Sequence, residues 1–173
     1  MSSRIRIAAV AAPLAAALVL SGCGYDPADR AGETSAAQAT ESASADTSLQ
    51  QAGHLVADAR VLLRASDDVL QDPDVPGEWK SIAGQVKGAA ADQIGSLGDQ
   101  VPQGSAMIPG DQSDAVLQAA GRDAGVAYEA MLRANLPRLQ QAWAALKDSP
   151  DDAVAGVARD MEARMAEIAS QLP

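Results

Sequence analysis

The 173-residue chain has few aromatic side chains, one cysteine and one histidine. Two Trp, two Tyr and no Phe disfavour a large β-sandwich, because strands are enriched in aromatic and β-branched residues. One Cys excludes an internal disulfide, and one His excludes a metal site built from several histidines. The formal charge of −10 disfavours nucleic-acid binding, which requires a basic surface. Alanine, the residue with the highest helix propensity, is abundant, so helices are favoured.

The sequence also lacks an apolar run long enough to span a bilayer. The uncharged run from Ile7 to Leu20 has 14 residues, whereas a transmembrane helix needs about 20. Two arginines precede the run and Pro13 lies within it, which is typical of the hydrophobic region of a signal peptide. Residues 1–22 are therefore predicted to be a signal peptide.

The run ends in the tetrapeptide Leu20-Ser21-Gly22-Cys23. This segment resembles the lipobox of bacterial lipoprotein precursors, in which leucine and two small residues precede a cysteine. The resemblance covers residues 1–23 and says nothing about the domain that follows. It implies that signal peptidase II cuts between Gly22 and Cys23, and that Cys23 carries diacylglycerol and fatty acids such as palmitate. A plain cleaved signal peptide and an uncleaved anchor are the alternatives.

Two acyl chains are enough for stable membrane anchoring. Removal of residues 1–22 takes away two arginines and no acid, so the mature chain is more acidic still and has no polybasic patch for anionic lipids. We therefore expect the lipid on Cys23 to be the membrane contact, with the protein at the extracytoplasmic face of the cell membrane.

Residues 23–48 are rich in Ala, Ser, Thr and acidic residues, and they have too little apolar surface to offset the entropy of ordering. They are predicted to be a disordered tether. From Leu49 onward apolar residues recur at helical spacing, with Thr47 or Ser48 available as the helix cap. Residues 49–173 are predicted to form a helical domain.

Helix-breaking residues divide this domain. Pro73 ends the first helix and Pro76 begins the second. The connection 98–112 is rich in Pro and Gly, and a long helical stretch with Pro137 inside it follows. Ser149-Pro150-Asp151-Asp152 begins the last helix, with Ser149 as its cap. The predicted fold is all-α: an antiparallel bundle of four main helices, the third kinked or broken near Pro137, which would make five helices if it breaks.

No pattern in the sequence indicates catalysis, and we expect neither an enzyme nor a bound cofactor. His54 falls on the polar side of its helix, with no second His or Cys to share a metal ion. The segment beginning Asp72-Pro73-Asp74 partly matches a calcium-binding loop, but Pro76 occupies position 5 and Ala83 occupies position 12, where glutamate is required. It is predicted to be a polar link between helices.

Met161 and Met165 are four residues apart on an apolar stripe, and Met131 is a third thioether in the domain. Methionines on such a stripe are usually core residues, but thioethers also bind Cu(I). An extracytoplasmic protein that binds a small ligand or copper is therefore the alternative function.

The best candidate for a partner surface is the connection 98–112, because long links are often functional. Its apolar residues are Val101, Met107 and Ile108. Trp79 and Trp143 fall on helix stripes, which predicts core anchors, and the alternative is that one of them is partly exposed beside this connection. The leading hypothesis is a non-catalytic interaction module that binds a protein of the cell envelope.

Overall fold

The computed structural model describes residues 32–172, with side chains from Ser42 onward. This part of the chain is all-helical and contains no strand; its elements are α1 (Gly32–Gln71), α2 (Gly77–Leu97), α3 (Gly110–Gln118), α4 (Gly121–Ala145) and α5 (Asp152–Gln171). The predicted signal peptide, the lipobox with Gly22 and Cys23, and the first part of the predicted tether lie outside the described residues. None of the helices described combines the length and hydropathy needed to cross a membrane.

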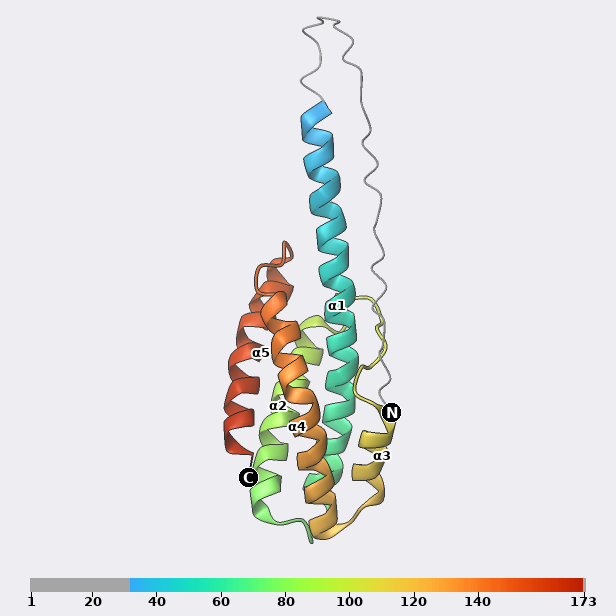
Figure 1. Cartoon of the computed structure of the whole chain (residues 1–173), viewed down its shortest axis with the longest axis vertical. Coiled ribbons are helices and arrows are strands. Elements are labelled where there is room, and N and C mark those ends of the chain that lie inside the picture. Colours follow the sequence, from blue (N-terminus) through green and yellow to red (C-terminus); the bar gives the residue numbers. More distant parts are fainter. Residues whose placement is uncertain (1–31, 173) are drawn as a thin grey trace, which may run out of the picture.

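The four longer helices lie side by side along the long axis of the molecule, and the short α3 packs beside them (Figure 1). α1 has its largest contact with α2, and α5 packs against both α2 and α4. α4 also packs against α1 and α3. The prediction of an all-α fold is confirmed, with five helices among the described residues.

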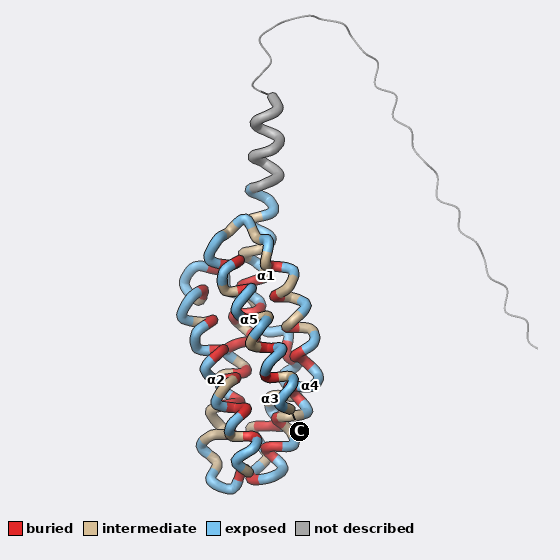
Figure 2. The backbone as a smooth tube through the Cα atoms, turned by 90° about the vertical axis from the view of Figure 1, so that its left-hand side faces the viewer, coloured by how far each residue is buried: buried red, intermediate tan, exposed pale blue. Residues whose placement is uncertain are grey.

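Buried positions recur along the helices, and together they form one apolar core (Figure 2). Trp79 and Trp143 are both buried in this core, as the helical stripes predict. Ser66 on α1 and Tyr128 on α4 place a buried hydrogen bond inside it, with 2.7 Å between their hydroxyl oxygens. Burial raises the pKa of Tyr128 above its ordinary value, so the phenol stays neutral.

The first helix begins earlier than the sequence predicts. α1 starts at Gly32, so residues 32–48 are helical where a disordered tether was expected. Thr47 and Ser48 do not cap a helix start; their hydroxyls donate to the carbonyls of Ala43 and Ser44, one turn earlier. Most side chains from Ser42 to Thr47 are exposed, and alanine favours helix without burial, so α1 continues past the packed domain.

The long third helical stretch is divided, but not at Pro137. α4 continues through Pro137, which is exposed, so water can reach the carbonyl left without its usual donor. The division falls at Ala119 and Ala120, which are extended. Gly121 then adopts a φ of +57°, and its N–H donates to Asp72 Oδ2 at 2.6 Å. Gly121, directly after the two alanines, was the available signal for this division, which was not predicted.

The predicted start of α2 is confirmed, and α5 begins two residues later than predicted. α2 begins directly after Pro76. At α5 the capping side chain is Asp151 instead of Ser149: Asp151 Oδ1 accepts the N–H of Val154 at 2.9 Å. Ser149 supports this cap, because its Oγ accepts the N–H of Asp151 at 3.2 Å.

Candidate functional site

Residues 98–109 link α2 to α3 and lie against α1; we call this segment the strap. Its apolar side chains Val101 and Ile108 are buried in the core. Its contacts with polar side chains of α1 come from Ser105, Met107 and Ile108. The strap is therefore an integral, packed part of the fold.

Asp58 on α1 is the centre of the contacts between α1, the strap and α4. Its side chain is 1% exposed. Oδ1 accepts the N–H groups of Met107 at 2.6 Å and Ile108 at 2.8 Å, and Oδ2 accepts a bond from Arg138 Nη2 at 2.9 Å. A buried carboxylate needs such partners, because an unpaired one would lose its hydration without replacement. Asp58 thus joins three separate segments of the chain.

Sequence reasoning did not identify Asp58. The available signal was its position on the first helix, between the buried residues Leu55 and Leu62, where the stripe is otherwise apolar. The partners of Asp58 lie 49 to 80 residues further along the chain, so a local pattern does not reveal them.

The strap approaches α1 most closely at a pair of glycines. A Cβ on Gly53 would collide with the carbonyl oxygen of Pro102, and a Cβ on Gly104 would collide with the backbone of Gly53. Beside them, Nδ1 of His54 lies 2.8 Å from the oxygen and 3.1 Å from the nitrogen of Ser105. His54 is exposed, as its place on the polar side of the helix predicts, and it is also a contact residue of the strap.

The predicted partner surface does not form as expected. Val101 and Ile108 are buried, so they are not surface contacts. Trp79 and Trp143 are buried as the predicted core anchors, so the alternative that one of them is partly exposed beside the connection does not hold. Met107 is 57% exposed and is the remaining member of that set. The chain carries no charged residue from Gln100 to Gly110, and Asp99 and Asp111 flank this uncharged stretch.

Trp79 is held by residues of α4. Its Nε1 donates to Glu129 Oε2 at 3.2 Å, and the guanidinium of Arg122 lies 5.7 Å from the ring centroid. Gly125 lies against the ring so closely that a Cβ there would collide with it. Glu129 also accepts a bond from Arg133 at 2.7 Å; this bond, and then the one from Trp79, hold the pKa of Glu129 below its usual value. These contacts hold the Trp79 side chain in one position between α2 and α4.

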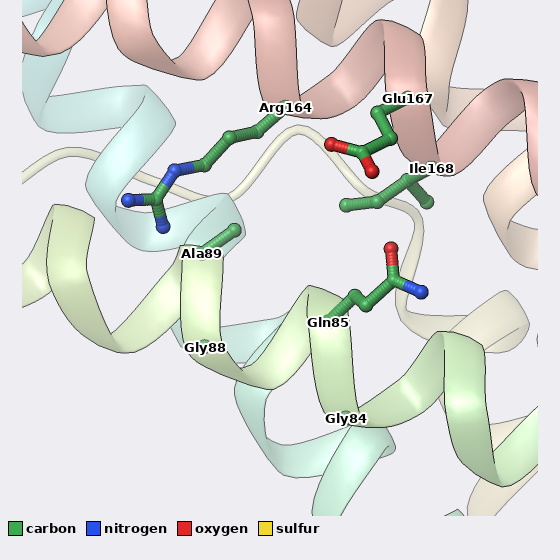
Figure 3. Close-up of a pocket in the computed structure, with 7 residues that line it drawn as sticks. All are labelled: Gly84, Gln85, Gly88, Ala89, Arg164, Glu167 and Ile168. Atoms are coloured by element: carbon green, nitrogen blue, oxygen red, sulfur yellow. The ribbon is translucent and has the colours of Figure 1, made fainter.

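A cleft of about 310 Å³ lies between α2 and α5 (Figure 3). On the α2 side, Gly84 and Gly88 present bare backbone, and a Cβ at either position would meet nothing within 4 Å. Arg164, Glu167 and Ile168 line the α5 side. The cleft therefore combines an open backbone wall with charged and apolar side chains.

Arg164 is already paired at this cleft. Its Nη1 lies 2.7 Å from Asp92 Oδ2, and its Nε lies 2.9 Å from Asp160 Oδ2. The hydrogen bond that Arg164 donates to Asp92 is the main cause that raises the pKa of Arg164. The Arg164 guanidinium lies between the carboxylates of Asp92 and Asp160, and Glu167 adds a third carboxylate. This region therefore has more negative than positive charge.

Two smaller clefts of about 190 Å³ each lie between α4 and α5, around Pro137, and between α3 and α4, around Ala127. The lining of all three clefts includes no serine, cysteine, histidine or aspartate. None of the three therefore places a nucleophile beside a base.

The acidic link after α1 stabilises a turn. Asp72 Oδ1 accepts the N–H of Asp74 at 2.9 Å, and Oδ2 accepts the N–H of Gly121. The bond from Gly121, followed by the bond from Asp74, holds the pKa of Asp72 below its usual value. Across residues 32–172 no group of three or more His, Cys, Asp or Glu is arranged to hold a metal ion.

Met131, Met161 and Met165 are all buried in the apolar core. They fill space between helices there, as methionines on an apolar stripe usually do.

No protein-family model matches the chain. No curated protein matches it, and no solved structure matches it.

Proposed function

We propose that this chain is a lipoprotein, anchored through Cys23 at the extracytoplasmic face of the cell membrane, where it acts as a non-catalytic interaction module. The observation that carries the proposal is the tetrapeptide Leu20-Ser21-Gly22-Cys23 at the end of a 14-residue apolar run. An acylated Cys23 supplies the membrane affinity that an acidic chain without a polybasic patch lacks.

The shape of α1 supports a domain held away from the membrane. The part of α1 before Leu49 extends beyond the other helices, and most side chains from Ser42 to Thr47 are exposed (Figure 1). As a helix, residues 32–48 measure about 25 Å. A stalk of this length places the packed domain clear of the lipid headgroups.

We also infer that α1, α2, α4 and α5 form an antiparallel four-helix bundle. Each of them packs against two others in the ring α1–α2–α5–α4, and the chain reverses direction between neighbours in this ring (Figure 1). The strap and α3 then lie on the outside of the bundle, where a partner has access to them.

The outward side of the strap is the surface that best suits a protein partner. Its backbone is fixed by Asp58, so little conformational entropy is lost when a partner binds. Charged residues are depleted and methionine is enriched at the centres of protein interfaces, and the strap presents Met107 among uncharged residues. A protein of the cell envelope with an uncharged, apolar contact surface is the expected partner.

Binding of a small ligand is the second candidate, and the cleft between α2 and α5 favours it. The surplus of carboxylates near Arg164 suits a cationic ligand, whereas a copper-binding form would use Met131, Met161 and Met165. A rise in the melting temperature with Cu(I) under reducing conditions, lost in Met161→Leu/Met165→Leu, would favour copper binding over the interaction module.

Metabolic labelling with an alkyne fatty acid tests the anchor. The wild-type protein should incorporate the label and sediment with membranes, and Cys23→Ala should do neither, because the acceptor sulfur is gone. Cys23→Ser is the matched control for side-chain size and should behave like Cys23→Ala. Equal labelling of wild type and variants would refute the lipoprotein proposal.

Site-specific photocrosslinking in cells tests the interaction module. A photoreactive residue at position 107 should yield a defined crosslinked protein, whereas one at Val126, the other exposed large hydrophobic residue, should not. Equal crosslinking at both positions, or none at position 107, would argue against the strap as the partner surface.

A further inference from the structure

The methionines of the described chain differ sharply in exposure. Met107 on the strap is 57% exposed, whereas Met131, Met161 and Met165 are at most 2% exposed. A thioether reacts with a soluble oxidant only when the oxidant reaches its sulfur. The fold therefore leaves one of these four sulfurs open to attack and shields three.

The exposure of Met107 is fixed by the fold. Asp58 Oδ1 accepts the N–H groups of both Met107 and Ile108, at 2.6 and 2.8 Å, which fixes the backbone of the two residues. Ile108 then faces the core and Met107 faces outward. The side chain of Met107 thus leaves the backbone on the outward side, and a backbone rotation that turned it inward would break both bonds and expose Ile108.

We propose that Met107 is a methionine sulfoxidation site that reacts selectively with two-electron oxidants such as hydrogen peroxide. The sulfur attacks one peroxide oxygen, the O–O bond breaks, and a sulfur–oxygen bond forms. The thioether is oxidised by two electrons to the sulfoxide, and the remaining peroxide oxygen takes up the protons and leaves as water. The product is of the class that methionine sulfoxide reductases return to the thioether.

Oxidation at this position changes the surface and leaves the fold intact. The sulfoxide adds a strong hydrogen-bond acceptor to a segment that has no charge from Gln100 to Gly110. The outward side chain of Met107 takes no place in the apolar core, so the added oxygen displaces no core atoms. The modification therefore replaces an apolar contact at position 107 with a polar one, and it does so whether or not the chain carries a lipid.

The test is a time course of the full-length protein with hydrogen peroxide, followed by peptide mass spectrometry and thermal unfolding. Met107 should be oxidised about tenfold faster, or more, than any of the three core methionines, in line with its access to solvent. The melting temperature should stay unchanged after the first oxygen is added. Among the peptides that contain these four methionines, Met107→Leu should remove the first oxidation event, and Met161→Leu, the matched control in the core, should retain it.

Two results would overturn the inference. One is oxidation of Met131, Met161 or Met165 at the rate of Met107, because the core would then not shield its sulfurs. The other is a fall in the melting temperature with the first oxygen, because Met107 would then contribute to packing. Neither result depends on Cys23, so failure here is distinguishable from failure of the lipoprotein proposal.

Discussion

Two faces of the molecule use the same residue types with opposite consequences. Where the strap meets α1, Gly53 is in backbone contact and Asp58, 1% exposed, pairs with Arg138 at 2.9 Å. Where α2 meets α5, Gly88 faces open space and Asp92, 61% exposed, pairs with Arg164 at 2.7 Å. The distances are similar, but burial differs. Burial, and not residue type, therefore decides what each glycine and each ion pair contributes to stability.

The largest effect is expected from Asp58→Ala. It leaves two N–H groups of the strap and the Arg138 guanidinium without their acceptor, and breaking a buried pair in this way costs about 3 kcal/mol or more. Urea unfolding followed by tryptophan fluorescence measures this loss. Asp92→Ala removes an equally short but exposed pair and should cost less than about 1 kcal/mol. If Asp58→Ala and Asp92→Ala lost similar free energies of unfolding, burial would not decide what these two ion pairs contribute.

Gly53→Ala should also destabilise, by about 1–3 kcal/mol, because the new methyl group meets a backbone carbonyl that has no side-chain freedom to move away. The same urea titration measures it. An unchanged or higher stability would mean that the strap does not lie against α1 at this point.

Gly88→Ala should act in the opposite direction and stabilise by about 0.4–1 kcal/mol. Its Cβ meets nothing within 4 Å, and alanine restricts the unfolded chain and favours helix. Gly95→Ala, on the same helix but outside the cleft, is the control and should give a similar gain. A loss of stability in Gly88→Ala would show that the cleft is closed by neighbouring atoms.

The smallest effect on stability is expected from removing the stalk. A chain that starts at Leu49 should keep the melting temperature of the longer chain within a few degrees, because most side chains from Ser42 to Thr47 are exposed. Its helical circular dichroism should nevertheless fall by the share that residues 32–48 contribute. If residues 32–48 were not helical, truncation would leave the total helical circular dichroism unchanged. A large drop in melting temperature would mean that the stalk packs on the domain.

The helices of the packed domain could be predicted because their signals are local. The apolar stripes placed Trp79 and Trp143 in the core, and Pro76 marks a helix start through its own backbone preference. Pro137 misled the prediction because the cost of an internal proline depends on its surroundings, and an exposed position reduces that cost. The division at Ala119 escaped prediction because it depends on a distant acceptor, Asp72.

The candidate surface was less predictable for the same reason. Val101, Met107 and Ile108 are equally plausible contacts when read as apolar residues of a long link. Which of them faces outward is decided by Asp58, which lies about 50 residues earlier in the chain and holds the backbone of the strap. Only a structure joins these segments, and it retains Met107 alone as the exposed contact of the three.

The most direct test of the account is the mass of the mature N-terminus. Protein extracted from membranes should begin at Cys23, and its N-terminal peptide should carry the added mass of a diacylglyceryl group on that cysteine. A mature chain that begins at another residue, retains residues 1–22, or has a free Cys23 thiol would contradict the proposal that the protein is anchored by lipid on Cys23.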